Sequence, residues 1–201
     1  MITKDRLAII LSKLKIFETP NLKLEQYPTD SQVAAEILWF AHMHKDIQGK
    51  VVADLGSGTG ILGIGALILG AKQVYFVDVD NQALTLAKQN LQSLNLQNAV
   101  FLKQEIQDFN QKVDTVLQNP PFGVQNPHAD RPFLDKAFQI SKTIYSLHME
   151  DSEQFIKQRI PANFTLKHII RFKLPIKKTQ KFHKKPIHDI NTACFVIKRN
   201  V

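Results

Sequence analysis

A polar amide ends a short apolar segment near the middle of this 201-residue chain. The segment Val113 to Gln118 contains the β-forming residues of a buried strand. Asn119 follows it, and the next two residues, Pro120 and Pro121, prevent a strand from continuing. Open α/β sheets bind their ligands just beyond the carboxyl ends of the strands. If the rest of the chain forms such a sheet, Asn119 lies where chemistry is expected.

Asn119, Pro120, Pro121 and Phe122 have the properties needed to hold an exocyclic amine such as adenine N6. The lone pair of that nitrogen is delocalised into the ring, and acceptors for both amino hydrogens restore part of its nucleophilicity. The Asn119 side-chain oxygen and the Pro120 carbonyl supply two acceptors, the prolines fix the backbone, and Phe122 can stack on the base. We predict these four as catalytic residues. The alternative is a Pro-Pro turn that merely ends a strand.

A glycine-rich turn follows an earlier apolar segment, Val51 to Leu55. The sequence D-L-G-S-G-T-G, Asp54 to Gly60, leads into an apolar helix pattern and would bring backbone N–H groups against a ligand. Residues 58–63 also match the G-x-G-x-x-G dinucleotide fingerprint, which alone is a weak signal. Asp54 favours the cationic amino-acid tail of S-adenosyl-L-methionine over a pyrophosphate, which it would repel. The sequence therefore predicts S-adenosyl-L-methionine as the cofactor.

Two further strand ends carry candidate cofactor ligands. Asp78 ends the second predicted strand, where a carboxylate can accept both hydroxyls of a ribose. After the third, Glu105 could accept from an adenine amino group and Ile106 offers a backbone N–H and an apolar wall, although a surface-loop position is an equal alternative for Glu105. The predicted cofactor-binding residues in this part of the chain are Asp54, Gly56, Gly58, Gly60, Leu62, Asp78, Val79, Glu105, Ile106 and Asn119.

Strand and helix patterns alternate after residue 50. The expected strands are 51–55, 73–77, 99–102, 113–118 and 143–147, the expected helices are 4–17, 32–44, 61–69, 82–94, 132–142 and 152–159, and two β-rich segments follow at 164–174 and 192–197. This alternation indicates right-handed βαβ units and a mostly parallel sheet. The predicted fold class is α/β: a Rossmann-like, mostly parallel seven-stranded sheet with helices on both faces and a carboxyl-terminal antiparallel hairpin.

The composition, with 44% hydrophobic and 22% charged residues, is that of one globular domain, which we expect to span residues 1–201. The single cysteine, Cys194, and the lack of a leader pattern favour a cytoplasmic location, with the nucleus as an alternative for a eukaryotic source. The longest apolar stretch, Ile61 to Ala71, contains three glycines. It is shorter than the ~20 residues that a bilayer span requires, so no membrane contact is expected.

Positive charge is concentrated at the carboxyl end. The chain carries a net charge of +8, and residues 157–201 hold twelve Lys and Arg against one acid, which gives +11 there and −3 in the first 156 residues. Such a distribution is typical of a protein that binds a polyphosphate, with a solvated surface as the alternative. The residues predicted to contact RNA are Lys177, Lys178, Lys181, Phe182, His183, Lys184 and Lys185. His183 and His188 lack companion ligands, so no metal site is predicted.

Several motifs resemble a known family. Asp54 to Gly60 together with Asn119 to Phe122 is similar to class I, S-adenosylmethionine-dependent N6-adenine methyltransferases. The segments that resemble the methyltransferase-like protein 5 family, in chain order, are Glu25–Thr29 (E-Q-Y-P-T), Asn119–Gly123 (N-P-P-F-G), Tyr145–His148 (Y-S-L-H) and Lys181–Lys185 (K-F-H-K-K). The similarity extends from about Phe17 to the carboxyl terminus.

This resemblance implies a class I methyltransferase fold and methylation of N6 of an adenosine in small-subunit ribosomal RNA. It implies that residues 1–48 form amino-terminal helices and a cofactor-covering segment, in which Gln26 and Thr29 fold onto the cofactor. It also implies that Asp78 holds the ribose, that Glu105 and Ile106 hold the adenine, and that residues 160–201 form a basic hairpin facing the RNA. Glu105 stands where the family has an aspartate.

The resemblance also implies a partner, because eukaryotic relatives pair with a small zinc-binding activator protein. The segment Ala99 to Leu102 is expected at a sheet edge and is apolar on both faces, which suits strand addition. Three alternative functions remain open: protein glutamine-N5 methylation, DNA adenine-N6 methylation, and a non-catalytic RNA-binding or ribosome-assembly role. Phe122 and the basic segment favour RNA over glutamine, and the intact Asp54, Asp78 and Asn119 favour an enzyme.

Overall fold

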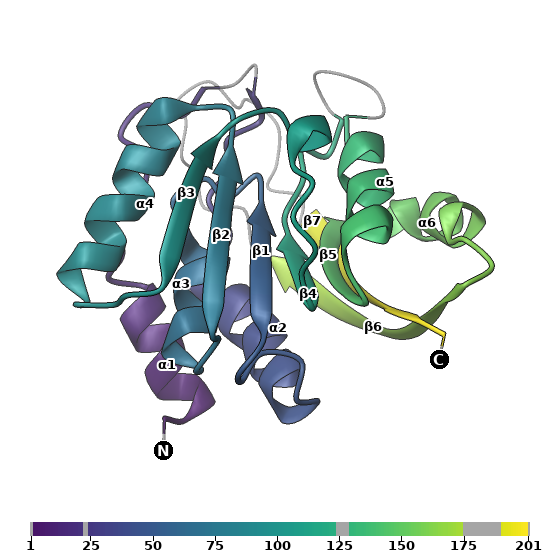
Figure 1. The fold of residues 1–201 in the computed structure, drawn as a ribbon, viewed down its shortest axis with the longest axis horizontal. Coiled ribbons are helices and arrows are strands. Elements are labelled where there is room, and N and C mark those ends of the chain that lie inside the picture. Colours follow the sequence, from purple (N-terminus) through teal and green to yellow (C-terminus); the bar gives the residue numbers. More distant parts are fainter. Residues whose placement is uncertain (1, 22–23, 124–128, 175–189, 201) are drawn as a thin grey trace.

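The computed structural model describes residues 2–21, 24–123, 129–174 and 190–200. Within them, seven strands form one sheet in the order β3-β2-β1-β4-β5-β7-β6 (Figure 1). The strands are β1 (Val51–Leu55), β2 (Gln73–Asp78), β3 (Ala99–Lys103), β4 (Thr115–Gln118), β5 (Thr143–Met149), β6 (Phe164–Leu174) and β7 (Ile190–Arg199). β1 to β5 run parallel, and β7 lies antiparallel to both β5 and β6. The predicted α/β fold with a terminal antiparallel hairpin is confirmed.

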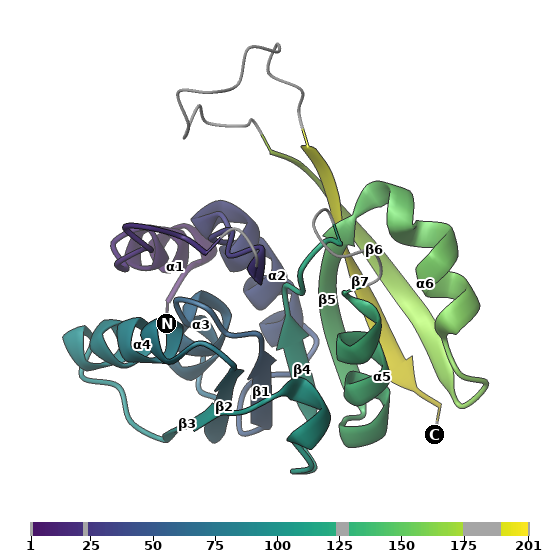
Figure 2. The ribbon, with the colours of Figure 1, turned by 90° about the horizontal axis from the view of Figure 1, so that it is seen from above.

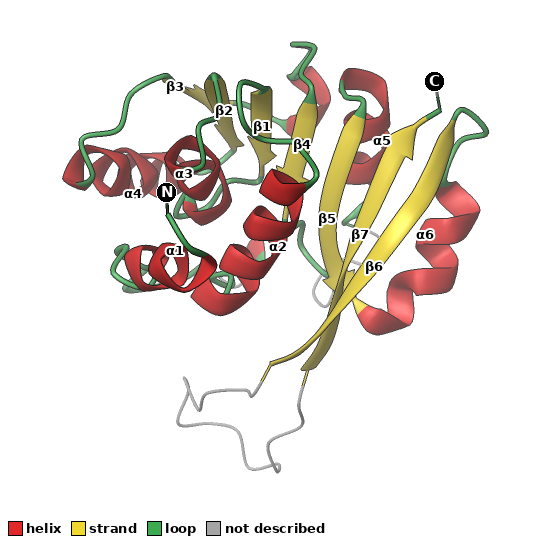
Figure 3. Ribbon diagram, turned by 90° about the horizontal axis from the view of Figure 1, so that it is seen from below, coloured by secondary structure: helices red, strands yellow, loops and turns green. Residues whose placement is uncertain are grey.

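Helices cover both faces of the sheet. They are α1 (Lys4–Leu11), α2 (Ser31–Met43), α3 (Ile61–Ile68), α4 (Asn81–Ser93), α5 (Arg131–Ile140) and α6 (Glu153–Arg159), with short 3₁₀ turns η2 (Ile106–Asp108) and η3 (Glu150–Ser152). α1 to α4 pack on one face, around core residues such as Leu38 and Ile64. α5 and α6 pack on the other, around Leu134 and Ile144 (Figures 2 and 3).

The central strands are buried on both faces. β1 is buried from Val52 to Leu55, and all of β4 is buried, since both strands lie between two layers of helices. This arrangement explains why the apolar residues of these strands do not alternate with exposed polar ones. Asp54, Thr115 and Gln118 are buried polar exceptions within these strands. Asp54 and Gln118 lie near the carboxyl ends of β1 and β4.

The first helix is shorter than predicted. It begins as expected after Thr3, whose hydroxyl accepts a hydrogen bond from the Arg6 N–H at 3.3 Å, but it ends at Leu11 rather than at residue 17. The chain leaves the helix because the backbone of Lys15 pairs with a side chain: Lys15 N–H donates to Asn90 Oδ1 at 2.8 Å, and Asn90 Nδ2 donates to the Lys15 carbonyl at 3.0 Å. The apolar periodicity of residues 12–17 therefore does not continue the helix.

β3 lies at one edge of the sheet, as predicted for Ala99 to Leu102, and these four residues are half-buried. Residues 104–114, which connect β3 to β4, form no helix longer than η2. On the face of the sheet that carries α5 and α6, Tyr75 and Leu102 remain partly exposed. None of the helices in the described ranges is both long and apolar enough to span a bilayer.

Candidate active site

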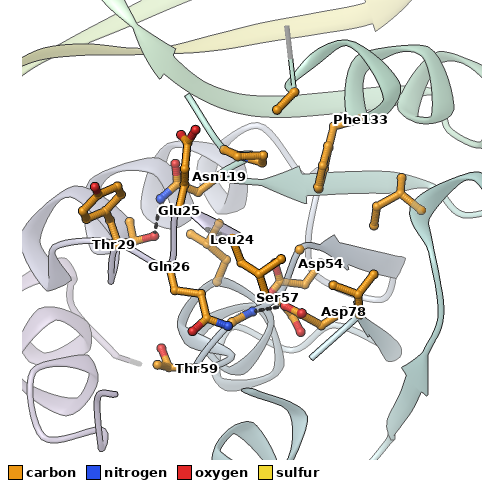
Figure 4. A pocket seen from close by; sticks show the side chains of 18 of the residues that line it. Leu24, Glu25, Gln26, Thr29, Asp54, Ser57, Thr59, Asp78, Asn119 and Phe133 are labelled. Atoms are coloured by element: carbon orange, nitrogen blue, oxygen red, sulfur yellow. Dashed lines mark hydrogen bonds between the residues drawn. The ribbon is translucent and has the colours of Figure 1, made fainter. Parts of the chain in front are cut away.

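The carboxyl ends of β1, β2 and β4 border a cavity of about 300 Å³ (Figure 4). Its wall combines segments that are distant in the sequence: residues 17–29, the glycine loop after β1, the turns after β2 and β3, the turn after β4, and the start of α5. The sequence-predicted residues that line it are Gln26, Thr29, Asp54, Gly56, Gly58, Leu62, Asp78, Val79, Glu105, Ile106, Asn119 and Pro121. One cavity thus holds most of the predicted cofactor residues together with Asn119 and Pro121.

The glycine loop is shaped by its contact with α5. Gly56 has a φ of 66°, and its N–H donates to the Val77 carbonyl at 2.9 Å. A Cβ at Gly56 would lie 2.9 Å from the ring of Phe133, so both the backbone conformation and the available space favour glycine here. Phe133 lines the cavity. In the sequence, Phe133 has the spacing of a core residue of the expected helix 132–142, and nothing there marks it as a cavity residue.

Asp54 is a buried carboxyl at the end of β1, with 1% of its surface exposed. Its Oδ2 accepts a hydrogen bond from the Gly63 N–H at 2.8 Å, at the first turn of α3. Burial raises the pKa of Asp54 to about 8, the Gly63 hydrogen bond acts in the opposite direction, and the charge of Asp78 adds to the rise. A cationic group bound in the cavity would stabilise the ionised form, so Asp54 is suited to hold such a group.

Asp78 organises the loop as well as facing the cavity. Its Oδ2 accepts from the Gly58 N–H at 2.8 Å, and its Oδ1 accepts from the Asp80 N–H at 2.9 Å. Burial raises the pKa of Asp78, while these backbone N–H groups oppose the rise. The hydrogen bond to Gly58 was not anticipated from the sequence, since it depends on how β1 and β2 lie side by side.

The segment before α2 crosses the cavity toward β2. Gln26 Nε2 donates to Asp80 Oδ2 at 2.7 Å, and Gln26 Oε1 accepts from the Asn21 N–H at 2.9 Å. Asp80 itself caps α4, because its other oxygen accepts from the Gln82 N–H at 2.8 Å. Gln26 is therefore fixed at the cavity wall, where it was predicted to contact a cofactor.

The same segment contacts both ends of the Asn119–Gly123 motif. Asn119 Nδ2 donates to Thr29 Oγ1 at 2.9 Å, a contact drawn in Figure 4. Glu25, which is 7% exposed, accepts from the Gly123 N–H at 3.0 Å. Asn119 Oδ1 is buried and has no hydrogen-bond donor among the described residues. Sequence reasoning missed Glu25, because an acid in a polar extended segment gives no sign that it is buried.

A buried asparagine ties the chain after α1 to the glycine loop. Asn90 Nδ2 donates to the carbonyls of Lys15 and Thr59, both at 3.0 Å. This contact places Phe17 at the cavity, 3.8 Å from where a Cβ of Gly58 would stand. Asn90 thus joins the chain before the covering segment to the glycine loop. Glu25 and Thr29 join the covering segment itself to the Asn119–Gly123 motif.

Three predicted residues do not line the cavity: Gly60, Pro120 and Phe122. Gly60 has a structural role, since its φ is 83° and a Cβ there would lie 2.9 Å from the Cβ of Ala87. Pro120 is buried, and Phe122 is half-buried. Their predicted contacts with a base stay predictions.

The predicted RNA-binding residues, Lys177 to Lys185, lie outside the described residues. Within the described ranges, no group of three or more His, Cys, Asp and Glu side chains is arranged to hold a metal ion.

Residues 31–182 match the model of the methyltransferase small domain family. The chain belongs to this family. Its relatives include the rRNA N(6)-adenosine-methyltransferase METTL5 of Danio rerio, which is 35% identical over 90% of this chain and 91% of the relative. The Mettl5 protein of Drosophila melanogaster is also named as an rRNA N(6)-adenosine-methyltransferase. It is 33% identical over 87% of this chain and 86% of the Drosophila chain. These matches confirm the resemblance to the methyltransferase-like protein 5 family.

The fold of this methyltransferase is also found in a solved structure. The crystal structure of the Pyrococcus horikoshii protein PH1948 has a TM-score of 0.90 and 42% sequence identity, and the match covers 98% of each chain. The prediction of a class I methyltransferase fold is confirmed. S-adenosyl-L-methionine is the cofactor of the chain, and the buried carboxyl of Asp54 in the cavity fits its cationic amino-acid end.

Proposed function

We propose that this methyltransferase modifies N6 of an adenosine in small-subunit ribosomal RNA. The observation that carries the proposal is the state of the Asn119 amide. Its nitrogen already donates a hydrogen bond to Thr29, and its buried oxygen has no donor among the described residues. An oxygen in this state favours an incoming N–H donor, because a buried acceptor without a partner is unfavourable. An exocyclic amine supplies such a donor.

The cofactor supplies a methyl group activated by its sulfonium. We assign its amino-acid end to Asp54 and the glycine loop, its ribose to Asp78, and its adenine to Glu105 and Ile106, all of which line the cavity. Gln26 closes the cavity from the covering segment. The chain needs no nucleophile of its own for such a transfer. Its contribution is to orient the amine and to exclude water.

The target base would be held by the Asn-Pro-Pro-Phe segment. Asn119 Oδ1 accepts one amino hydrogen, and the Pro120 carbonyl accepts the other. Phe122 stacks on the base, as in other sites that bind unpaired nucleotides. The amino group is then held without a strong base, and its proton leaves to water after transfer.

Two lines of evidence support ribosomal RNA as the substrate. The METTL5 relatives of Danio rerio and Drosophila melanogaster are named as rRNA N(6)-adenosine-methyltransferases. The carboxyl-terminal residues 157–201 carry a net charge of +11, and five of their lysines lie between residues 177 and 185. We propose that Lys177 to Lys185 bind backbone phosphates near the target adenosine.

The test is methyl transfer from labelled cofactor to four acceptors: small-subunit rRNA, total RNA, DNA and a protein extract. The expected product after RNA digestion is N6-methyladenosine. Asn119→Ala should lower the rate by roughly 10²–10³-fold, the usual cost of losing one preorganised hydrogen-bonding group. The matched control is Asn163→Ala, an exposed asparagine in a loop far from the cavity lining. Label in glutamine or DNA, no transfer to RNA, or undiminished transfer by Asn119→Ala would contradict the proposal.

We further propose that a small zinc-binding activator protein adds to the edge strand β3. Residues 99–102 of the strand are half-buried and stand at the sheet edge, and Leu102 of β3 and Tyr75 of the neighbouring β2 are partly exposed. An apolar edge of this kind favours strand addition by another chain. Co-expression with such a protein should give a stable 1:1 complex in size-exclusion chromatography. A protein that is monodisperse and fully active alone would argue against this partner.

A further inference from the structure

A chain of buried polar groups runs behind the cavity, from β4 through β5 to the start of α5. Gln118 Nε2 donates to Ser146 Oγ at 2.8 Å, and Ser146 Oγ lies 2.5 Å from His148 Nε2. His148 Nδ1 then lies 3.3 Å from Asp130 Oδ2. Gln118, Ser146 and His148 are each at most 1% exposed, and Asp130 is 7% exposed.

We call the chain Gln118–Ser146–His148–Asp130 the relay. Its hydrogen bonds all run in one direction, from Gln118 as the first donor to Asp130 as the last acceptor. The Gln118 amide can only donate through Nε2, so the Ser146 hydroxyl is free to donate to His148 Nε2. A neutral imidazole with its proton on Nδ1 then donates to the Asp130 carboxylate. Burial lowers the pKa of His148, in agreement with a neutral ring. The three contacts of the relay therefore form together in one protonation state, while Gln118 Oε1 has no donor among the described residues.

The arrangement of Ser146, His148 and Asp130 resembles a nucleophilic triad, but it does not serve as one. Ser146 has no exposed surface, and neither it nor His148 lines the cavity. A nucleophile must reach its substrate. The relay therefore acts on other parts of the chain rather than on a ligand.

The two ends of the relay flank the catalytic motif. Gln118 is the last residue of β4 and directly precedes Asn119. Asp130 directly precedes α5, and its side chain does not cap that helix but turns to His148 instead. Asn119 to Phe122 is thus attached to β5 directly before its first residue, through Gln118, and the start of α5 is attached to the same strand through Asp130.

We propose that the relay Gln118–Ser146–His148–Asp130 positions the catalytic motif, with Ser146 and His148 as positioning residues for methyl transfer. This inference rests on the proposed role of Asn119 as the acceptor of the amine. Small displacements of a positioned group reduce rates strongly, because reaction requires a near-attack geometry. The relay limits such displacements from a side of the motif that neither substrate nor cofactor touches.

Ser146→Ala tests the relay with a minimal change, since it removes one hydroxyl and interrupts two contacts. We expect kcat to fall by roughly 10- to 100-fold at a temperature well below unfolding. The dissociation constants for S-adenosyl-L-methionine and RNA should stay unchanged. The KM-against-kcat split distinguishes positioning from loss of binding.

Tyr145→Phe is the matched control. Tyr145 precedes Ser146 on β5, is 1% exposed, and donates to Asp46 Oδ2 at 2.7 Å on the opposite face. This variant also removes one buried hydroxyl and its hydrogen bond, so it should lower the melting temperature to a similar degree while leaving kcat unchanged. Equal kcat values for Ser146→Ala and Tyr145→Phe would overturn the proposal.

Hydrogen exchange supplies a readout that needs no activity. Peptides covering residues 118–123 should exchange faster in Ser146→Ala than in the wild type or in Tyr145→Phe, with S-adenosyl-L-methionine bound in each case. Unchanged exchange would also overturn the proposal. If the wild type methylates protein or DNA instead of RNA, the proposed function fails, whereas the relay is still decided by kcat on that acceptor and by the exchange rates.

Two variants of His148 then divide the relay. His148→Gln places an amide near the position of Nε2 and keeps the contact with Ser146, whereas His148→Asn places one near Nδ1 and keeps the contact with Asp130. We expect each to retain more activity than His148→Leu, which removes both contacts. Equal loss in all three variants would show that only the packing volume of His148 matters, contrary to the proposal.

Discussion

Thr29 Oγ1 lies 2.9 Å from Asn119 Nδ2 and accepts its hydrogen bond, although 90 positions separate the two residues in the sequence. The contact joins the segment that covers the cavity to the motif that holds the acceptor. In this arrangement the contact occupies the nitrogen of the Asn119 amide, while its buried oxygen has no donor among the described residues. The amide oxygen is therefore left for a substrate.

We expect Thr29→Val, which has the same shape without the hydroxyl, to lower kcat by roughly five- to tenfold, the value of about one hydrogen bond. The amide of Asn119 would lose the hydrogen bond that fixes its orientation, so ordering it would add to the barrier of each transfer. Steady-state kinetics with RNA and S-adenosyl-L-methionine measures the effect. The KM for the cofactor should change less than kcat.

Thr29→Ser is the matched control, because it restores the hydroxyl and should recover most of the rate. If Thr29 acts only on the cofactor, Thr29→Val will instead raise the KM for S-adenosyl-L-methionine and leave kcat intact. That outcome would separate Thr29 from the orientation of Asn119.

The stability of the ligand-free protein should fall as the pH rises from about 7 to 8.5, above the range in which the lowered pKa of His148 acts in the opposite direction. Burial raises the pKa of Asp54 to about 8 from an ordinary value of 3.8, so between these values the folded state binds a proton that the unfolded state has released. Unfolding free energy then decreases with pH, by at most about 1.4 kcal/mol per unit for one group. The raised pKa of Asp78 acts in the same direction. Thermal unfolding at constant ionic strength measures the slope.

Asp54→Asn provides the comparison for this pH dependence. Its amide oxygen can still accept from the Gly63 N–H, but the group no longer titrates, so the slope of stability with pH should become shallower. The same variant should bind S-adenosyl-L-methionine more weakly, since it lacks the carboxylate. An identical slope in the wild type and in Asp54→Asn would contradict the assignment of the buried proton to Asp54.

The sequence predicted the cavity because its signals are local. Each signal is contained in a short stretch of sequence. One strand ends in Asn-Pro-Pro, another contains an acid and leads into a glycine turn, and a third ends in an acid. Parallel strands place their carboxyl ends at one edge, so Asp54, Asp78 and Asn119 had to meet there. The structure brings all three into one cavity.

The contacts that close the cavity could not be predicted, because they join residues far apart in sequence. Glu25 binds the N–H of Gly123 and Asn90 binds the backbone of Lys15, with nothing in either local pattern to mark a buried partner. The predicted end of the first helix was wrong for the same reason. Its apolar spacing continues to Leu14, but a tertiary contact at Lys15 ends it earlier.

Gly63 offers a test of packing beneath Asp54. It lies in α3 with an ordinary helical backbone, yet a Cβ there would lie 2.7 Å from Phe76 Cζ and 3.0 Å from Asp54 Oδ2. We expect Gly63→Ala to destabilise the protein by about 1–3 kcal/mol through overpacking, although alanine favours helices in general. Denaturant unfolding measures the change.

Gly49→Ala is the control for this substitution. Gly49 has a φ of 71° but no atom within 4 Å of its added Cβ, so only backbone strain opposes alanine, at a cost of about 1–2 kcal/mol. Cofactor affinity should fall in Gly63→Ala, which displaces Asp54, and should be unchanged in Gly49→Ala. Unchanged affinity in both would separate the packing at Gly63 from the position of the Asp54 carboxylate.

Replacing Lys181, Lys184 and Lys185 with glutamine should weaken RNA binding and leave cofactor binding unchanged. If each lysine neutralises one phosphate of a single-stranded target, the slope of log affinity against log salt should become shallower by about 2, at roughly 0.7 per phosphate. Fluorescence anisotropy with a labelled RNA, repeated over a series of KCl concentrations, gives the slope. The loss should be largest at low salt, where counterion release contributes most.

The control for this charge change replaces Lys13, Lys72 and Lys142, three exposed lysines, with glutamine. Lys72 and Lys142 directly precede β2 and β5, at the amino ends of the strands and therefore opposite the cavity. The net charge falls by the same three units in both triple variants, so a general field effect would lower the affinity equally. Because a local contact requires charge beside the bound RNA, only the first triple variant should flatten the salt dependence. Equal slopes in the two variants would contradict the assignment of Lys181 to Lys185 as the RNA-binding segment.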